Sequence, residues 1–106
     1  MESKYAITCK DEVLKVELAG RLDATNAEGL QAELKGFTGQ KVSKLIFFAK
    51  DLEYISSAGL SVIIFAKQKV GDDAHLILVA APEAILNVIK MSGLDHFMTI
   101  LDTYTG

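Results

Sequence analysis

The 106-residue sequence contains a single cysteine, Cys9, so an internal disulfide is excluded. A lone cysteine agrees with a reducing compartment. Cys9 alternates with Tyr5 and Ile7 in a segment rich in β-formers, which indicates a half-buried strand residue rather than a reactive thiol. Half of the residues are hydrophobic, and a chain of this length can bury a hydrophobic core as one domain.

The sequence also lacks any concentration of positive charge. Its formal net charge is -3, and its lysines and arginines are scattered, which gives no support for a nucleic-acid surface. The longest apolar run, Leu76 to Ala81, is far shorter than the roughly 18 residues typical of a membrane span. The polar first residues, 1–4, lack the apolar region of a signal peptide. We therefore expect a cytoplasmic protein without a membrane span.

Residues that could carry catalysis or hold a metal ion are sparse. His75 and His96 are far apart in the sequence, and neither has a second ligand three or four residues away. The segment 36–41 contains a lysine but lacks the spacing of a phosphate-binding loop. The acid pairs at 11–12 and 72–73 fall in expected turns. The sequence thus predicts no catalytic residue, no metal site and no cofactor, and we expect that the protein is not an enzyme.

Hydrophobic periodicity predicts a hairpin followed by alternating strands and helices. Strands are expected at Tyr5 to Cys9, Val13 to Ala19, Val42 to Phe48 and Leu76 to Ala80, with a loop from Ala49 to Ile55. Helices are expected from Thr25 or Asn26 to about Lys35, from Ser57 to a stop at 71–73, and from Pro82 to 92–93. Phe97 to Leu101 fits either a short strand or a helical turn.

This order of elements predicts an α/β fold. Right-handed crossovers would give a mostly parallel sheet of four to five strands, with an N-terminal antiparallel hairpin and about three helices. No linker, repeat or low-complexity segment interrupts the sequence, so residues 1–106 are expected to form a single domain.

Two adjacent serines, Ser56 and Ser57, precede the most apolar of the expected helices. A serine at this position can accept a hydrogen bond from an early helical N–H group and so cap the helix. The N-terminus of a helix also carries partial positive charge, which makes a phosphate on either hydroxyl physically reasonable. From the residues alone, helix capping and phosphorylation both remain open.

The same helix has two distinct faces. At 100° per residue, Ser57, Ser61 and Gln68 share one face, while Ile64 and Phe65 lie on either side of that polar stripe. The opposite face is expected to lie in the core and consists of Val62, Ile63, Ala66 and Val70. Ile64 and Phe65 could be partly buried against loops, or they could form the rim of a docking surface.

The segment from Ser56 to Leu60, followed by its apolar helix, resembles the signature of STAS domains, specifically of anti-sigma factor antagonists. The usual pattern of that family is Asp-Ser-Ser/Thr-Gly-Leu. The segment 20–24 resembles the family's Gly-x-Leu-Asp-Ala, and Ser92-Gly93-Leu94 followed by Phe97 resembles its close after the last long helix. The resemblance covers nearly the whole chain, in order.

The resemblance implies a phospho-switchable binding module. In the family, the unphosphorylated protein binds an anti-sigma factor that is also a serine kinase, and this releases a sigma factor for transcription. Phosphorylation breaks the complex, and a phosphatase restores it. Aligned on Gly59-Leu60, the phosphoserine is Ser57, with Ser56 as the less favoured acceptor. The resemblance, taken together with the docking face of the helix, predicts the partner-binding residues Asp23, Ser56, Ser57, Ser61, Ile64, Phe65 and Gln68.

Two departures from the family pattern remove acid from this site. Phe48 and Ser56 stand where the family usually has Asp. They favour an alternative from another class, a non-switching STAS adaptor or ligand-sensing module in which Ser57 is only a helix cap. Asp51 and Glu53 precede the serines and are expected to add to the repulsion of a partner after phosphorylation. Asp23 could serve the docking surface or only form hydrogen bonds within its own turn.

Overall fold

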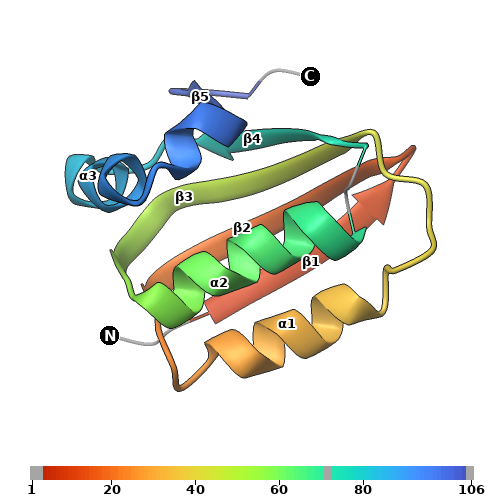
Figure 1. The fold of residues 1–106 in the computed structure, drawn as a ribbon, viewed down its shortest axis with the longest axis horizontal. Helices are drawn as coiled ribbons and strands as arrows, with labels where there is room; N and C mark the ends of the chain where they lie inside the picture. Colours follow the sequence, from red (N-terminus) through yellow and green to blue (C-terminus); the bar gives the residue numbers. More distant parts are fainter. Residues whose placement is uncertain (1–3, 71–72, 105–106) are drawn as a thin grey trace.

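The structure, a computed structural model, describes residues 4–70 and 73–104. Its five strands form one sheet in the order β1-β2-β3-β4-β5, and they are Lys4–Lys10, Val13–Leu22, Lys44–Ile55, His75–Val79 and Thr99–Leu101 (Figure 1). Strand β1 is antiparallel to β2, and all other neighbouring strands are parallel. The α-helices are α1 (Ala27–Lys35), α2 (Ser57–Phe65) and α3 (Glu83–Ser92). The expected α/β fold is confirmed.

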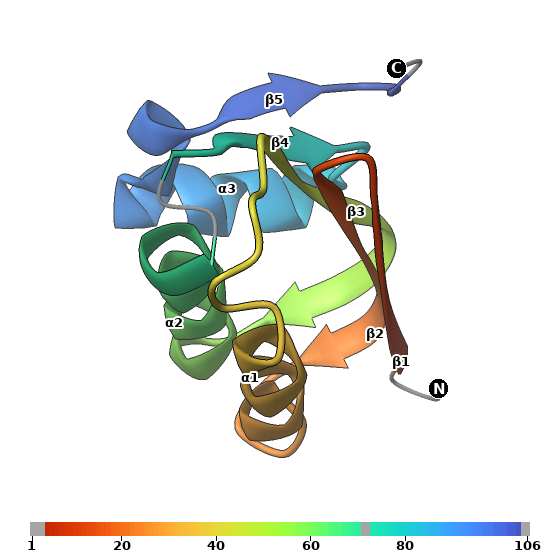
Figure 2. The same ribbon diagram turned by 90° about the vertical axis from the view of Figure 1, so that its right-hand side faces the viewer.

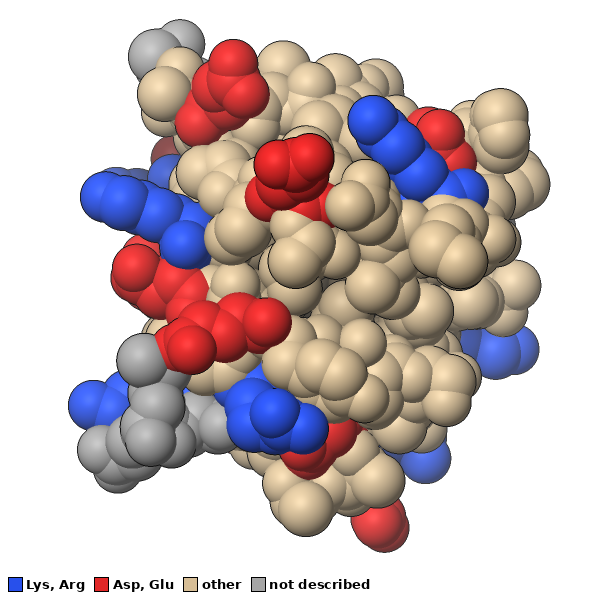
Figure 3. Space-filling view, turned by 90° about the vertical axis from the view of Figure 1, so that its left-hand side faces the viewer, with Lys and Arg blue, Asp and Glu red and all other residues tan. Residues whose placement is uncertain are grey.

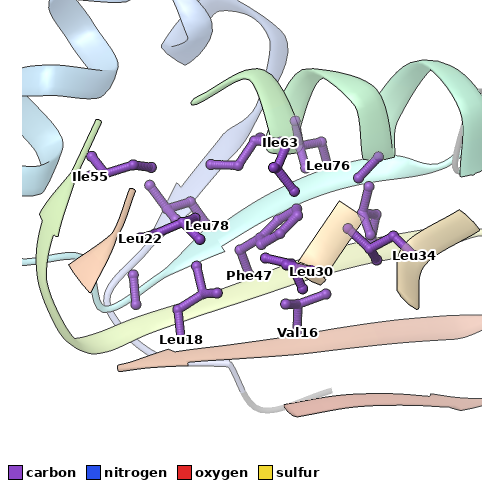
Figure 4. Close-up of a cluster of buried hydrophobic side chains, with 14 of the residues drawn as sticks. Val16, Leu18, Leu22, Leu30, Leu34, Phe47, Ile55, Ile63, Leu76 and Leu78 are labelled. Atoms are coloured by element: carbon purple, nitrogen blue, oxygen red, sulfur yellow. The ribbon is translucent and has the colours of Figure 1, made fainter. Parts of the chain in front are cut away.

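The three helices cover one face of the sheet, which curves around them (Figure 2). Phe47 of β3 is buried at the centre of the core between the sheet and helices (Figure 4). Leu22 and Ile55, at the ends of β2 and β3, extend this core toward the start of α2. No helix in the described ranges is long and apolar enough to cross a membrane.

A smaller apolar cluster lies on the opposite face of the sheet. It is formed around the buried residues Ile46, Ile77 and Val79. Phe48 belongs to this cluster and packs edge-on against Tyr104, with ring centroids 6.0 Å apart. Phe48 therefore lies on the face of the sheet that α2 does not cover. An acid at this position would lie in an apolar cluster, where a charge is costly to bury.

The expected loop from Ala49 to Ile55 is wrong, because β3 continues to Ile55 and pairs with β2 as far as Leu22. Register shifts between β2 and β3 mark bulges in this part of the sheet. The buried residues are consequently three apart, at Ala49, Leu52 and Ile55, rather than two apart as in a regular strand. The sequence lacks the alternation of a strand here because the bulges interrupt it.

The C-terminal segment contains both of the alternatives left open by the sequence. Leu94–Phe97 forms a short 3-10 helix, η2, and Thr99–Leu101 forms β5. Helix α2 passes directly into a π-helical turn, η1 (Ala66–Val70), so the helical segment extends to the expected length. The expected stop at Gly71 and Asp72 lies outside the described residues.

Candidate functional site

The start of α2 is fixed against the ends of β2 and β3. The Ser56 backbone N–H donates to the Leu22 carbonyl oxygen at 2.9 Å. The Ser56 hydroxyl oxygen accepts a hydrogen bond from the Gly59 backbone N–H at 3.3 Å, which caps the helix. Gly59 is buried, and a Cβ atom there would lie 2.7 Å from the Leu22 oxygen and 2.8 Å from the Ile55 side chain. The helix can approach the strands this closely only because Gly59 has no side chain.

Ser57, the first residue of α2, has an exposed side chain. Its backbone carbonyl accepts a hydrogen bond from the Ser61 hydroxyl at 3.0 Å, but its own hydroxyl has no hydrogen-bond partner within residues 4–70 and 73–104. The structure thus gives the capping role to Ser56, and the expectation that Ser57 is the cap in the alternative interpretation is wrong. The Ser57 hydroxyl is accessible and is not engaged in holding the fold.

An outward-facing row runs along α2 and η1 from this serine. Its members are exposed and comprise Ser57, Ser61, Ile64 and Gln68, and we call them the α2 row. The side chains expected in the core are buried, as predicted: Val62, Ile63, Ala66 and Val70. Ile64 is 39% exposed, whereas Phe65 is half-buried and packs against the core. Ile64 therefore lies on the surface of the site and Phe65 mainly supports it.

The exposed face of α2 is uncharged, but Glu28 of α1 lies beside it, in a hollow lined also by Ala58 and Ser61. Helix α2 itself has no acidic or basic residue. Figure 3 views the end of the molecule at which α2 begins, and a band of uncharged surface extends across the middle and right of that view. An uncharged surface with a row of hydroxyl, apolar and amide side chains is suited to protein binding, and a negative charge added to it would alter its character.

The family of this chain follows from its similarity to known proteins. Residues 4–105 match the model of the STAS domain family. Over 84 residues the chain is 33% identical to BtrV of Bordetella bronchiseptica, which is named as an anti-sigma factor antagonist. This match covers 78% of the chain and 72% of BtrV. The chain belongs to the STAS family of anti-sigma factor antagonists.

Solved structures of the family share the fold of this STAS domain. An anti-sigma factor antagonist from Mycobacterium paratuberculosis superimposes with a TM-score of 0.82 at 22% identity, over 96% of this chain and 87% of that one. The Bacillus cell fate determinant SpoIIAA, in its phosphorylated form, superimposes with a TM-score of 0.71 at 20% identity. That match covers 92% of this chain and 90% of SpoIIAA.

Asp23 of this STAS domain is held in a local network just after β2. Its carboxylate accepts hydrogen bonds from the Thr25 hydroxyl at 2.6 Å and the Thr25 backbone N–H at 3.0 Å. Arg21 Nε donates to the other carboxylate oxygen at 3.2 Å. These hydrogen bonds hold the pKa of Asp23 below its ordinary value, and those from Thr25 contribute most. Asp23 is therefore ionised at neutral pH. The structure shows the local hydrogen bonding that was one of the two roles expected for Asp23.

Further charged residues lie near this end of the sheet. The Arg21 guanidinium also stacks on the Tyr54 ring, 4.2 Å from its centroid. Asp51 and Glu53, expected near Ser57 from their place in the sequence, line a hollow together with Lys4 and Lys50. Their expected contribution to the repulsion of a partner after phosphorylation therefore stays a prediction.

The close approach of α2 to the sheet was not predicted from the sequence. In the sequence, Gly59 is part of the family motif. An isolated glycine within a strongly apolar helix can also indicate close packing. Phe97 is part of the C-terminal segment that resembles the family. The structure shows that its side chain is 70% exposed. No sequence pattern distinguishes an exposed Phe in a short 3-10 helix from a buried one, because so short an element shows no periodicity.

Proposed function

We propose that this STAS domain is a phospho-switchable binding protein rather than an enzyme. In its unphosphorylated form it binds an anti-sigma factor in the cytoplasm and so releases a sigma factor for transcription. The anti-sigma factor is the kinase that phosphorylates Ser57, and a phosphatase reverses the modification. The observation that carries this proposal is the exposed Ser57 hydroxyl, free of hydrogen bonds within the described residues, at the head of the uncharged α2 row. The names of BtrV and of phosphorylated SpoIIAA support it.

The physical chemistry of the site suits a switch. A phosphate on Ser57 adds a charge of about −1.5 to −2. The N-terminus of α2 tolerates an anion, so the fold is not disturbed, and α2 carries no basic residue that would neutralise the charge. A docked partner would instead have to cover that charge. A loss of about 2.7 kcal/mol in binding free energy corresponds to a roughly 100-fold weaker complex, which is enough for a switch.

The first prediction concerns which serine accepts the phosphate. Incubation with the cognate kinase and ATP is expected to add one phosphate to the wild-type protein and none to Ser57→Ala, measured by intact-mass spectrometry. The matched control is Ser56→Asn, which removes the neighbouring hydroxyl but retains a side chain that caps helices as well as Ser does. Because the acceptor remains, Ser56→Asn is expected to take up one phosphate.

Phosphate on Ser56, shown by its loss in Ser56→Asn and retention in Ser57→Ala, would refute the assignment of the acceptor. Absence of any modification would instead favour the non-switching adaptor or ligand-sensing module, which Phe48 and Ser56 support as departures from the family pattern. Genes that encode a serine kinase and a phosphatase beside this one would favour the switch. Transporter-subunit genes would favour the adaptor.

The second prediction separates the docking role of Ile64 from the structural role of Phe65. Ile64→Ala is expected to change the free energy of unfolding by less than about 1 kcal/mol, yet to weaken partner binding more than about fivefold. Phe65→Ala is expected to cost about 2 kcal/mol of stability, because its half-buried ring packs against the core. Urea unfolding and titration calorimetry with the partner measure the two effects. Unchanged partner affinity in Ile64→Ala would remove Ile64 from the docking surface.

A further inference from the structure

The face of the sheet that the helices leave uncovered, which we call the outer face, carries an apolar cluster of its own (Figure 2). Ile46 of β3 and Ile77 and Val79 of β4 form its centre, and each is at most 5% exposed. The helices α1, α2 and α3 lie on the opposite face, where Leu76 and Leu78 of β4 belong to the main core. Side chains other than those of the α-helices therefore keep water away from this cluster.

Tyr104 provides part of this cover. It follows β5, is half-buried and packs against the cluster together with Phe48. The two rings meet edge-on with centroids 6.0 Å apart, and the ammonium groups of Lys15 and Lys44 lie 5.5 and 5.9 Å from the centroid of the Tyr104 ring. Tyr104 makes no hydrogen bond to another residue of the ranges 4–70 and 73–104. Ring contacts are individually weak, so a chain end held by them opens more easily than the whole domain unfolds.

Charged side chains on the outer face are complementary to those of a second copy. Leu14, Val16 and Leu18 of β2 belong to the main core. Because side chains alternate along a strand, Lys15 and Glu17 lie on the outer face. Twofold symmetry can place Lys15 of one copy opposite Glu17 of the other, so that two copies meet with opposite charges.

We propose that the outer face is a dimerisation surface for a second copy of this chain, and that Tyr104 covers it in the monomer. When the ring is displaced, the clusters of two copies pack against each other as the inner faces of two stacked sheets do. The cover weakens association in proportion to the fraction of molecules that are open, so a face open in about one molecule in ten associates about tenfold more weakly. The segment after β5 thus controls the oligomeric state of the domain.

The test is sedimentation of the protein, without any partner, over a range of concentrations. Tyr104→Ala is expected to self-associate at least about tenfold more tightly than the wild type, because it lacks the covering ring. Tyr104→Phe keeps the ring and is expected to behave as the wild type. The matched control is Tyr54→Ala, which removes a tyrosine ring that also contacts a cation, Arg21, but lies outside the cluster. Its self-association is expected to be unchanged.

NMR of the isotope-labelled Tyr104→Ala variant locates the surface. The methyl groups of Ile77 and Val79 are expected to shift with protein concentration. Those of Leu76 and Leu78 lie on the other face of the same strand and are expected to stay in place. Shifts confined to any other surface would place the contact elsewhere and overturn the proposal.

A charge exchange tests the contact between two copies. In the Tyr104→Ala background, Lys15→Glu is expected to weaken the dimer several-fold, because it places like charges opposite each other. Adding Glu17→Lys exchanges the two charges and is expected to restore the dimer. A failure to restore it would refute the pairing of Lys15 with Glu17 and with it the twofold arrangement.

Three further outcomes would overturn the proposal. Tyr104→Ala could fold and associate no more tightly than the wild type, or Tyr54→Ala could associate as tightly as Tyr104→Ala. Failure of Tyr104→Ala to fold, measured by circular dichroism, would show that the ring is part of the core and not a removable cover. Because these measurements use the protein alone and do not involve Ser57, none of these outcomes bears on the proposed phosphorylation switch.

Discussion

Ser57→Asp is expected to fold as stably as the wild-type protein and to bind the anti-sigma factor at least tenfold more weakly. An acid in the first turn of a helix interacts favourably with the helix N-terminus, and Ser56, which caps α2, is unchanged. Binding falls because the partner would have to cover a carboxylate on an uncharged helix, and Arg21 at the end of β2 already pairs with Asp23. Thermal unfolding and titration calorimetry measure the two effects separately.

Ser57→Asn is the control, since Asn has nearly the shape of Asp and carries no charge. If charge dominates, Ser57→Asn binds better than Ser57→Asp, and added salt narrows the difference because the side chain is exposed. If both variants bind equally and far more weakly than the wild type, the partner recognises the hydroxyl or its size. Wild-type affinity in Ser57→Asp would mean that the switch does not act through this serine.

Gly59→Ala is expected to lower the free energy of unfolding by about 3 kcal/mol, with loss of partner binding as a consequence. The added Cβ would lie 2.7 Å from the Leu22 carbonyl oxygen, a backbone atom that is part of the sheet and accepts a hydrogen bond from Ser56. This steric clash can be relieved only if α2 moves away from β2 and β3. Urea unfolding monitored by circular dichroism measures the loss.

Gly29→Ala is the matched control, because it places the same methyl group within helix α1. There the added Cβ would meet only the end of the Tyr5 side chain at 3.0 Å, which can shift. Ala is preferred to Gly in a helix by up to about 1 kcal/mol, so this variant is expected to remain within about 1 kcal/mol of the wild type. If Gly59→Ala were as stable as Gly29→Ala, the close approach of α2 to the sheet would be refuted.

The fold was predictable from the sequence wherever the hydrophobic residues follow one clear pattern, that of a strand or that of a helix. The apolar runs of β3 and β4 and the hairpin before them gave the sheet its class and direction, because buried parallel strands are continuously apolar. The end of β3 was not predictable in the same way. Leu52 and Ile55 are buried three residues apart across bulges, and this spacing matches neither a regular strand nor a helix.

The location of the candidate site was predictable from the sequence, but the separate roles of its two serines were not. The motif located the start of α2, but two adjacent serines have the same chemistry in the sequence. The hydrogen bond from Gly59 to the Ser56 hydroxyl distinguishes them, since it leaves the Ser57 hydroxyl exposed. Phe65 shows a similar limit, because helical spacing placed it beside the polar stripe, and packing against the core then buried half of it.

The attachment of α2 to the sheet has a consequence for the speed of signalling. The backbone of Ser56 is hydrogen-bonded to β2, and Gly59 lies directly against the same strand. A phosphoryl group on Ser57 would therefore be presented on a segment that is attached to the sheet on both sides of the serine. A switch built on such a segment would respond at the rate set by the turnover of the modifying enzymes and by dissociation of the complex.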